Sequence, residues 1–160
     1  MKSKLKLVWT PFPTLLFYTE LTKGGRVAGD AKYFLARVDN SRKDDLGIHA
    51  HEYRHVTHWW CVTLLVLFLV GLTHMFVYPL TPTGWLAALV VSTALYNVLT
   101  TLVPRARLFA ELDCYRVQLK VNGTLKHAGT YAKIIRERYG LEKYPESWIQ
   151  FVLEKGFDKK

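Results

Sequence analysis

Two histidines and a glutamate lie within five consecutive residues, 51–55, which read HEYRH. Side chains four residues apart on a helix project from one face, so the imidazoles of His51 and His55 can reach the same metal ion. Zinc in a catalytic site takes about three protein ligands and leaves one position for water, whose pKa it lowers towards roughly 7. Glu52 is placed to take the proton from that water as hydroxide attacks a carbonyl. The spacing therefore predicts a Zn²⁺ site for peptide hydrolysis, with Glu52 as general base.

The same motif permits a second interpretation. Four of the six histidines lie between residues 49 and 58, at the edge of a long apolar region, where a polar helix end at a membrane interface would have this composition. With three fixed positions, HExxH arises by chance in about one protein of this length in a hundred or two. Its context, a predicted helix directly after a predicted strand, favours the zinc site.

A third protein ligand has to come from outside the motif, and three residues are candidates. Glu111 is preferred, because it has a long side chain and lies on the first helix predicted after the apolar region. Asp113 has a shorter side chain and points about 160° away from Glu111 on a helix. His58 shares a face with His51 but lies roughly 10 Å farther along a straight helix. The alternative for Glu111 is a solvated charge paired with an arginine of its own helix.

A charge-free stretch of 50 residues begins at His55. Within it, residues 61–78 and 85–102 are two apolar runs of 18 residues, joined by a turn rich in proline and threonine. Each run is near the lower limit for crossing a hydrocarbon core of about 30 Å. A buried hairpin in a soluble core would show a polar face on each helix, which these runs lack. We therefore predict a transmembrane helical hairpin over residues 56–103.

The formal net charge of +9 is carried by the two ends of the chain. Arg54 precedes the hairpin, and Arg105 and Arg107 follow it, so the positive-inside rule places both termini in the cytoplasm. A nucleic-acid partner is not expected, because the sequence has no zinc-knuckle, helix-turn-helix or aromatic RNA-binding signature. The expected partners are a lipid membrane and a peptide or protein substrate.

The two cysteines, Cys61 and Cys114, are far apart in the sequence, and neither belongs to a CxxC pair. This argues against a disulfide framework and against a cysteine-ligated zinc site. Both are predicted to be reduced packing residues, which suits a protein that faces the cytosol.

The remaining segments predict a small mixed domain around the motif. Residues 15–21 and 32–38 are rich in aromatic and branched side chains and are linked by glycines, which predicts a β-hairpin. Asp44 and Asp45 favour the start of the helix that carries the motif and runs into the first apolar segment.

Three further helices are predicted after the apolar region, over residues 107–120, 128–138 and 145–154. The fold class is therefore α+β. We expect a single zincin-like domain over residues 1–160, with the hairpin 56–103 inserted between the motif helix and the helix of Glu111.

These segments resemble known zinc peptidases. HExxH followed by a glutamate on a later helix resembles the gluzincin pattern, and a two-span hairpin between the two is similar to HtpX-type membrane zinc peptidases. Residues 44–52 and 110–116 are also similar to small zinc peptidases encoded in phage genomes, and the resemblance covers roughly residues 30–120. It implies a minimal zincin fold. The HtpX-type pattern has an aspartate four residues after the glutamate, where this chain has Tyr115. Tyr115 would then hydrogen-bond a ligand histidine or the substrate oxyanion, or be an ordinary half-buried tyrosine.

A second hypothesis belongs to another functional class. A non-catalytic two-span membrane protein, such as a membrane-perturbing or scaffold component, would bind metal through its histidines incidentally or not at all. Glu52 discriminates between the two hypotheses, because neither metal binding nor a structural role requires a carboxylate beside His51.

Overall fold

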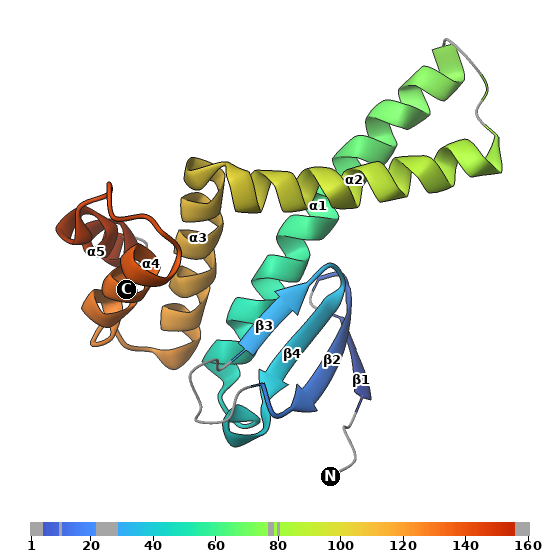
Figure 1. Cartoon of the computed structure of the whole chain (residues 1–160). Coiled ribbons are helices and arrows are strands. Elements are labelled where there is room, and N and C mark those ends of the chain that lie inside the picture. Colours follow the sequence, from blue (N-terminus) through green and yellow to red (C-terminus); the bar gives the residue numbers. More distant parts are fainter. Residues whose placement is uncertain (1–4, 10, 22–28, 77–78, 80, 156–160) are drawn as a thin grey trace.

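The computed structural model describes residues 5–9, 11–21, 29–76, 79 and 81–155, with the backbone alone for residues 5–7 and 9. Over these residues the chain has a mixed α+β fold with a four-stranded sheet and five α-helices (Figure 1). The predicted α+β class is therefore confirmed.

The sheet contains β1 (Leu5–Trp9), β2 (Pro13–Thr19), β3 (Gly29–Lys32) and β4 (Leu35–Asp39). Its order is β1-β2-β4-β3, so β3 is an edge strand. The β2–β4 pair is parallel, and the pairs β1–β2 and β3–β4 are antiparallel.

The predicted β-hairpin between residues 15–21 and 32–38 is wrong in its pairing. Both segments contain strands, but these strands, β2 and β4, run parallel. The hairpin is formed by β3 and β4, which are joined at Tyr33 in a left-handed conformation with φ of 59°. A two-residue hairpin turn requires such positive φ values, and glycine or asparagine usually marks it, so a tyrosine gave no signal.

Helix α1 (Leu46–Phe76) carries the HEYRH motif and continues without a break into the first apolar segment, as predicted. The Ile48 backbone N–H donates to the Asp45 carboxylate at 3.1 Å, which confirms Asp45 as a helix-starting residue. The N-terminal half of α1 packs on the sheet through a core of aliphatic side chains: Leu16, Ala36, Val38, Ile48 and Val56. This packing fixes the motif beside the sheet.

Helix α2 (Pro82–Leu102) forms a hairpin with α1 that projects away from the sheet (Figure 1). It begins three residues before the predicted run, because Thr81 caps it and Pro82 occupies its first turn. Among the described residues, α1 and α2 are the two helices long and apolar enough to cross a membrane, and 11% of the most apolar window of each is buried. Small polar side chains join them, with the Ser92 hydroxyl 3.4 Å from that of Thr63.

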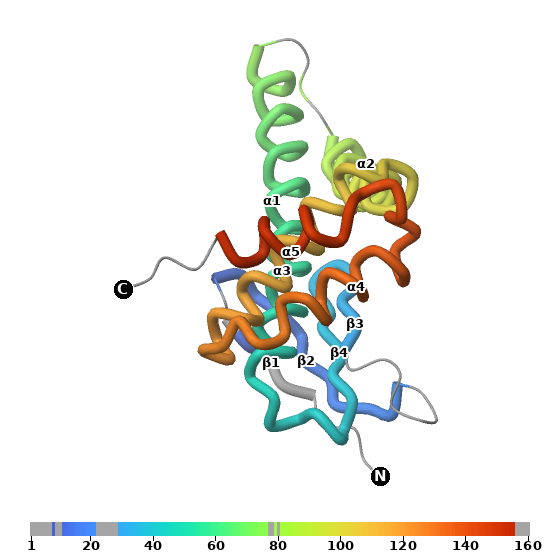
Figure 2. Tube along the Cα trace, turned by 90° about the vertical axis from the view of Figure 1, so that its left-hand side faces the viewer, coloured from blue at the N-terminus to red at the C-terminus, as the bar shows by residue number. Residues whose placement is uncertain are grey.

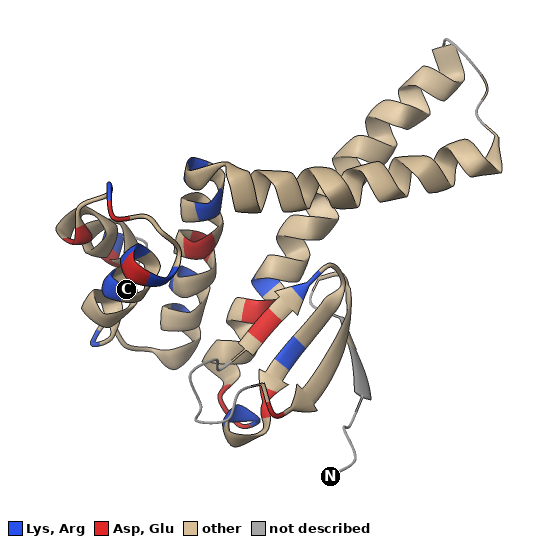
Figure 3. Cartoon of the chain, in the orientation of Figure 1, with Lys and Arg blue, Asp and Glu red and all other residues tan. Residues whose placement is uncertain are grey.

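The chain returns from the hairpin through α3 (Pro104–Asn122), which packs along α1, and continues into α4 (Ala128–Arg138) and α5 (Glu146–Lys155). All three predicted helices are confirmed, and α3 starts earlier because Pro104 opens it. In Figure 2, α4 and α5 lie in front of α3, on the side away from the sheet. Among the described residues, the part of the α1–α2 hairpin after Arg54 carries no charged residue, and the charged residues lie in the sheet, the first turns of α1, the helices α3 to α5 and the connecting loops (Figure 3).

Candidate metal centre

The two histidines of the motif face the same point from successive turns of α1. Their Nε2 atoms are 3.2 Å apart, and both rings are largely shielded from solvent. A tetrahedral zinc ion with Zn–N bonds of about 2.0–2.1 Å holds its ligand atoms about 3.4 Å apart. The separation of the two nitrogens therefore matches the edge of a zinc coordination tetrahedron.

Glu111 of α3 supplies a carboxylate to the same point. Its oxygens lie 3.8 Å from Nε2 of His51 and 3.7 Å from Nε2 of His55. Oε2 is buried and has no hydrogen-bond partner among the described residues. A buried carboxylate oxygen without a partner is costly unless a cation or proton compensates it. The His51, His55 and Glu111 set therefore fits a divalent metal ion.

The alternative environment for Glu111, an arginine of its own helix, is not what the structure shows. Arg116 donates to the backbone oxygen of Val152 at 3.0 and 2.6 Å. Arg107 lies over the ring of Tyr139, with its guanidinium carbon 5.0 Å from the ring centroid. Glu111 is thus buried at the α1–α3 interface instead of being paired on a solvated helix face.

Asp113 and His58, the less favoured ligand candidates, lie in a separate polar cluster. The Asp113 carboxylate is 2.8 Å from Nε2 of His58 and 2.5 Å from Nε of Arg54. Asp113 therefore also contacts α1, but with a different pair of side chains from those that Glu111 contacts.

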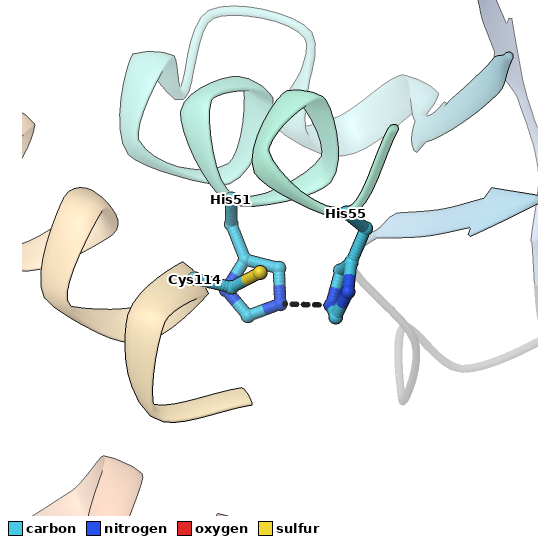
Figure 4. A group of neighbouring side chains, drawn as sticks. All are labelled: His51, His55 and Cys114. Atoms are coloured by element: carbon cyan, nitrogen blue, oxygen red, sulfur yellow. Dashed lines mark hydrogen bonds between the residues drawn. The ribbon is translucent and has the colours of Figure 1, made fainter. Parts of the chain in front are cut away.

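Cys114 is a further potential metal ligand that the spacing of residues in the sequence did not indicate. Its sulfur and the ligand nitrogens of His51 and His55 all lie within 4.8 Å of one another (Figure 4). The thiol is fully buried, and burial raises its pKa to about 11. The absence of a CxxC pair argued against a cysteine here, but these groups are brought together by two helices and not by a metal-binding loop. Cys61, predicted to be a packing residue, is exposed on α1.

Two tyrosines, Tyr115 and Tyr139, and the side-chain amide of Gln118 lie next to the ligand candidates. Tyr115 is buried, and its ring centroid lies 4.4 Å from that of His51 in an edge-on arrangement. Tyr139 lies beside the Glu111 carboxylate and lines both cavities together with His51. Gln118 approaches the His51 ring, whose Nδ1 has no hydrogen-bond partner among the described residues.

Tyr139 and Gln118 were not predicted from the sequence. Gln118 lies seven residues after Glu111, so heptad spacing could have indicated that it shares this face of α3. No pattern marks Tyr139, which lies just beyond the end of α4.

The pKa values of the cluster place an ionised carboxylate beside a protonated histidine. Burial lowers the pKa of His51 to about 3. Burial also lowers the pKa of His55, but Cys114 and Glu111 outweigh it, and the net shift is upward. Burial raises the pKa of Glu111, yet its contacts with His55 bring the pKa below the ordinary value. The ionised Glu111 carboxylate is thus balanced by a protonated His55, and a metal ion bound here would take the place of that proton.

No family model matches this chain, and neither a curated protein nor a solved structure matches it. The motif and its geometry therefore carry the functional argument.

Glu52 is buried beside the cluster, and burial raises its pKa to about 7. Its carboxylate lies so close to Gly29 of β3 that a methyl group on this glycine would be 2.4 Å from Oε1. Two cavities, of about 750 and 360 Å³, adjoin here and share the walls formed by Gly29, His51, Glu52 and Tyr139. Glu52 is therefore held between the ligand candidates and space that a substrate can enter.

Helix α2 borders the smaller cavity with Tyr96, Asn97, Thr100 and Thr101. The Tyr96 hydroxyl donates to the backbone oxygen of His55 at 3.3 Å. This contact ties the end of the apolar hairpin to the motif, so the candidate centre lies where α2 approaches the mixed domain.

Proposed function

We propose that the chain is a membrane-anchored zinc metallopeptidase. The observation that carries this proposal is the convergence of the Glu111 carboxylate on the paired Nε2 atoms of His51 and His55, with Glu52 buried beside them. Three ligands from two helices leave a fourth position, which distinguishes a catalytic zinc site from a closed structural one.

The roles of the protein groups follow from their positions. A zinc ion held here would lower the pKa of a water molecule and polarise a substrate carbonyl. Glu52 would accept the proton of that water and pass it to the leaving amine, tasks that suit a pKa near neutrality. Tyr139 lies beside the Glu111 carboxylate and would orient it through its hydroxyl when the metal is bound. Tyr115 packs against His51 and is the candidate donor to the substrate oxyanion.

The substrate would be an extended peptide segment. β3 is at the edge of the sheet, and its residues line both cavities next to Glu52. An edge strand offers backbone donors and acceptors to an added strand. A peptide bound there would pass over the candidate centre.

We further propose that α1 and α2 cross a bilayer and that both termini are cytoplasmic. The exposed apolar surface of the hairpin supports the first statement. Arg54 before the hairpin and Arg105 and Arg107 after it support the second. The centre would then lie near the cytoplasmic membrane surface.

The competing proposal is a non-catalytic two-span membrane protein with incidental metal binding. It is favoured by the thiol of Cys114 next to the histidines, since a fourth protein ligand would close the site. It does not explain why Glu52 is buried, with its pKa raised to about 7, at the wall of two cavities.

Zinc content and hydrolysis, measured together, test the proposed function. Protein purified in mild detergent should hold about one zinc ion and should degrade dye-labelled, unfolded casein. A chelator should stop the hydrolysis, and added zinc should restore it. His51→Ala should lose both properties, whereas His58→Ala, the matched control on the same helix, should keep them. Purified wild-type protein that takes up no zinc would rule out the proposal.

A further inference from the structure

Two helices each contribute a pair of potential ligands to one point. His51 and His55 are four residues apart on α1, and Glu111 and Cys114 are three residues apart on α3. Both spacings place a pair on one helix face. The Cys114 sulfur is buried and lies within 4.8 Å of the ligand nitrogens of both histidines (Figure 4). The Glu111 carboxylate is also buried, and its oxygens lie 3.8 and 3.7 Å from Nε2 of His51 and His55.

Cys114 is not an isolated buried thiol. Glu111 Oε2, which is buried and unpartnered among the described residues, faces the same histidines. The four side chains together offer two nitrogens, one oxygen and one sulfur, a donor set that zinc accepts in tetrahedral geometry. The thiol sulfur lies within 4.8 Å of the ligand nitrogens of both histidines, so the thiol is already within the cluster.

We propose that Cys114 is the fourth ligand of the bound metal in a resting state and that water replaces it in the active state. This inference rests on the proposed metal site and concerns its regulation. When the thiol replaces the water, the S–H bond and the metal–water bond break, the metal–sulfur bond forms, and one water molecule and one proton leave to solvent. In the reverse step a water molecule takes the position, the metal–sulfur bond breaks and the sulfur regains a proton. No electrons are transferred in either direction.

The exchange would make hydrolysis depend on opening the site. With the sulfur bound, zinc has four protein ligands and no position for water. A peptide entering from the cavities could reach the metal only after the Cys114 side chain has turned away from it.

Cobalt substitution tests the proposal without relying on activity. Co²⁺ is added to metal-free protein in detergent, with no substrate, and the absorption spectrum is recorded. Binding by wild-type protein should give the visible bands of four-coordinate cobalt together with a near-ultraviolet thiolate-to-cobalt charge-transfer band. Cys61→Ser, the matched control for the other cysteine, should give the same spectrum. Cys114→Ser and Cys114→Ala should keep the visible bands and lose the charge-transfer band.

The outcomes separate this inference from the proposed function. Visible bands without a charge-transfer band in wild-type protein would overturn the role of Cys114 and leave the three-ligand site standing. An absence of all cobalt bands in wild-type protein would overturn both. A charge-transfer band that disappears in Cys61→Ser and not in Cys114→Ser would also refute the assignment. Because the wild-type spectrum alone can decide, the proposal does not depend on the folding of a variant.

Discussion

Nε2 of His58 lies 2.8 Å from Oδ2 of Asp113, so the two less favoured ligand candidates are partners of one another. Arg54 adds a second contact to the same carboxylate. This cluster joins α1 to α3 beside the candidate metal centre, with the His58 ring centroid 6.3 Å from that of His55. Because Asp113 is paired in this cluster, Glu111 is the carboxylate of the two that faces His51 and His55.

Replacement of Glu111 by alanine should abolish tight zinc binding. Loss of a residue that only orients a ligand weakens metal binding by about 10–100-fold, and loss of a ligand should exceed this. Asp113→Ala and His58→Ala should keep most of the affinity, because their side chains bind each other. Competition with a zinc chelator would measure all three variants. Zinc retained in Glu111→Ala but lost in either other variant would overturn the assignment.

The same cluster predicts a pH-dependent contribution to stability. The hydrogen bond from His58, together with Arg54, lowers the pKa of Asp113 to about 2. A carboxylate with a depressed folded-state pKa stabilises the fold above its unfolded value, near 3.8, and loses this effect as the pH falls towards 2. Asp113→Asn should therefore lower the free energy of unfolding at pH 6 by up to about 1 kcal/mol, since solvent screens this partly exposed pair.

Unfolding of Asp113→Asn and wild-type protein in detergent, followed by circular dichroism from pH 6 to 2, would measure this difference. It should shrink between pH 4 and 2. A difference that stays constant over this range would argue against an ionic role for Asp113.

The helices could be predicted from the sequence to within a few residues. Asp45, Pro104, Gly123 and Gly140 are local signals of helix ends, and the structure uses each of them near the expected place. Strand pairing could not be predicted in the same way. The short strand β3 has no hydrophobic alternation, and the turn at Tyr33 lacks the usual glycine or asparagine.

Gly29 makes room for Glu52, which gives a test at a residue outside the motif. Gly29→Ala would place a methyl group 2.4 Å from Oε1 of Glu52 and would force this carboxylate to move. Displacing a catalytic group by about 1 Å can cost roughly 10²-fold in rate. The variant should therefore bind zinc like wild type and hydrolyse casein much more slowly.

Gly71→Ala is the matched control, because its added methyl group would make an ordinary 3.5 Å contact with Trp85. Equal activity of Gly29→Ala and Gly71→Ala would show that the position of Glu52 does not limit hydrolysis.

The topology predicts opposite accessibility of the hairpin turn and the C-terminal helices. In a Cys61→Ser background, a cysteine at Thr83 should react with an impermeant maleimide in intact cells. A cysteine at Lys126, which is also exposed, should react only after the membrane is permeabilised. Equal labelling of both in intact cells would contradict the predicted hairpin orientation. Release of the protein into buffer without detergent would contradict membrane insertion itself.

The motif part of the candidate site could be predicted from the sequence, because helical periodicity alone places His51 and His55 on one face. The position of Glu111 relative to them depends on how α3 packs along α1. Its long side chain and its place on the first helix after the hairpin could therefore only rank it above Asp113 and His58 as a ligand. Cys114 and Tyr139 depend on the same packing and on the placement of α4. Neither belongs to a sequence motif, and their proximity to the histidines comes entirely from the tertiary fold.

Hydrolysis of labelled casein by zinc-loaded Glu52→Gln, beside wild-type protein with the same measured zinc content, tests the central claim most directly. The amide keeps the shape of the side chain but cannot accept the proton of the attacking water. We expect about one zinc ion in each protein and a rate roughly 10²–10⁴-fold lower in the variant. Equal rates at equal zinc content would contradict it.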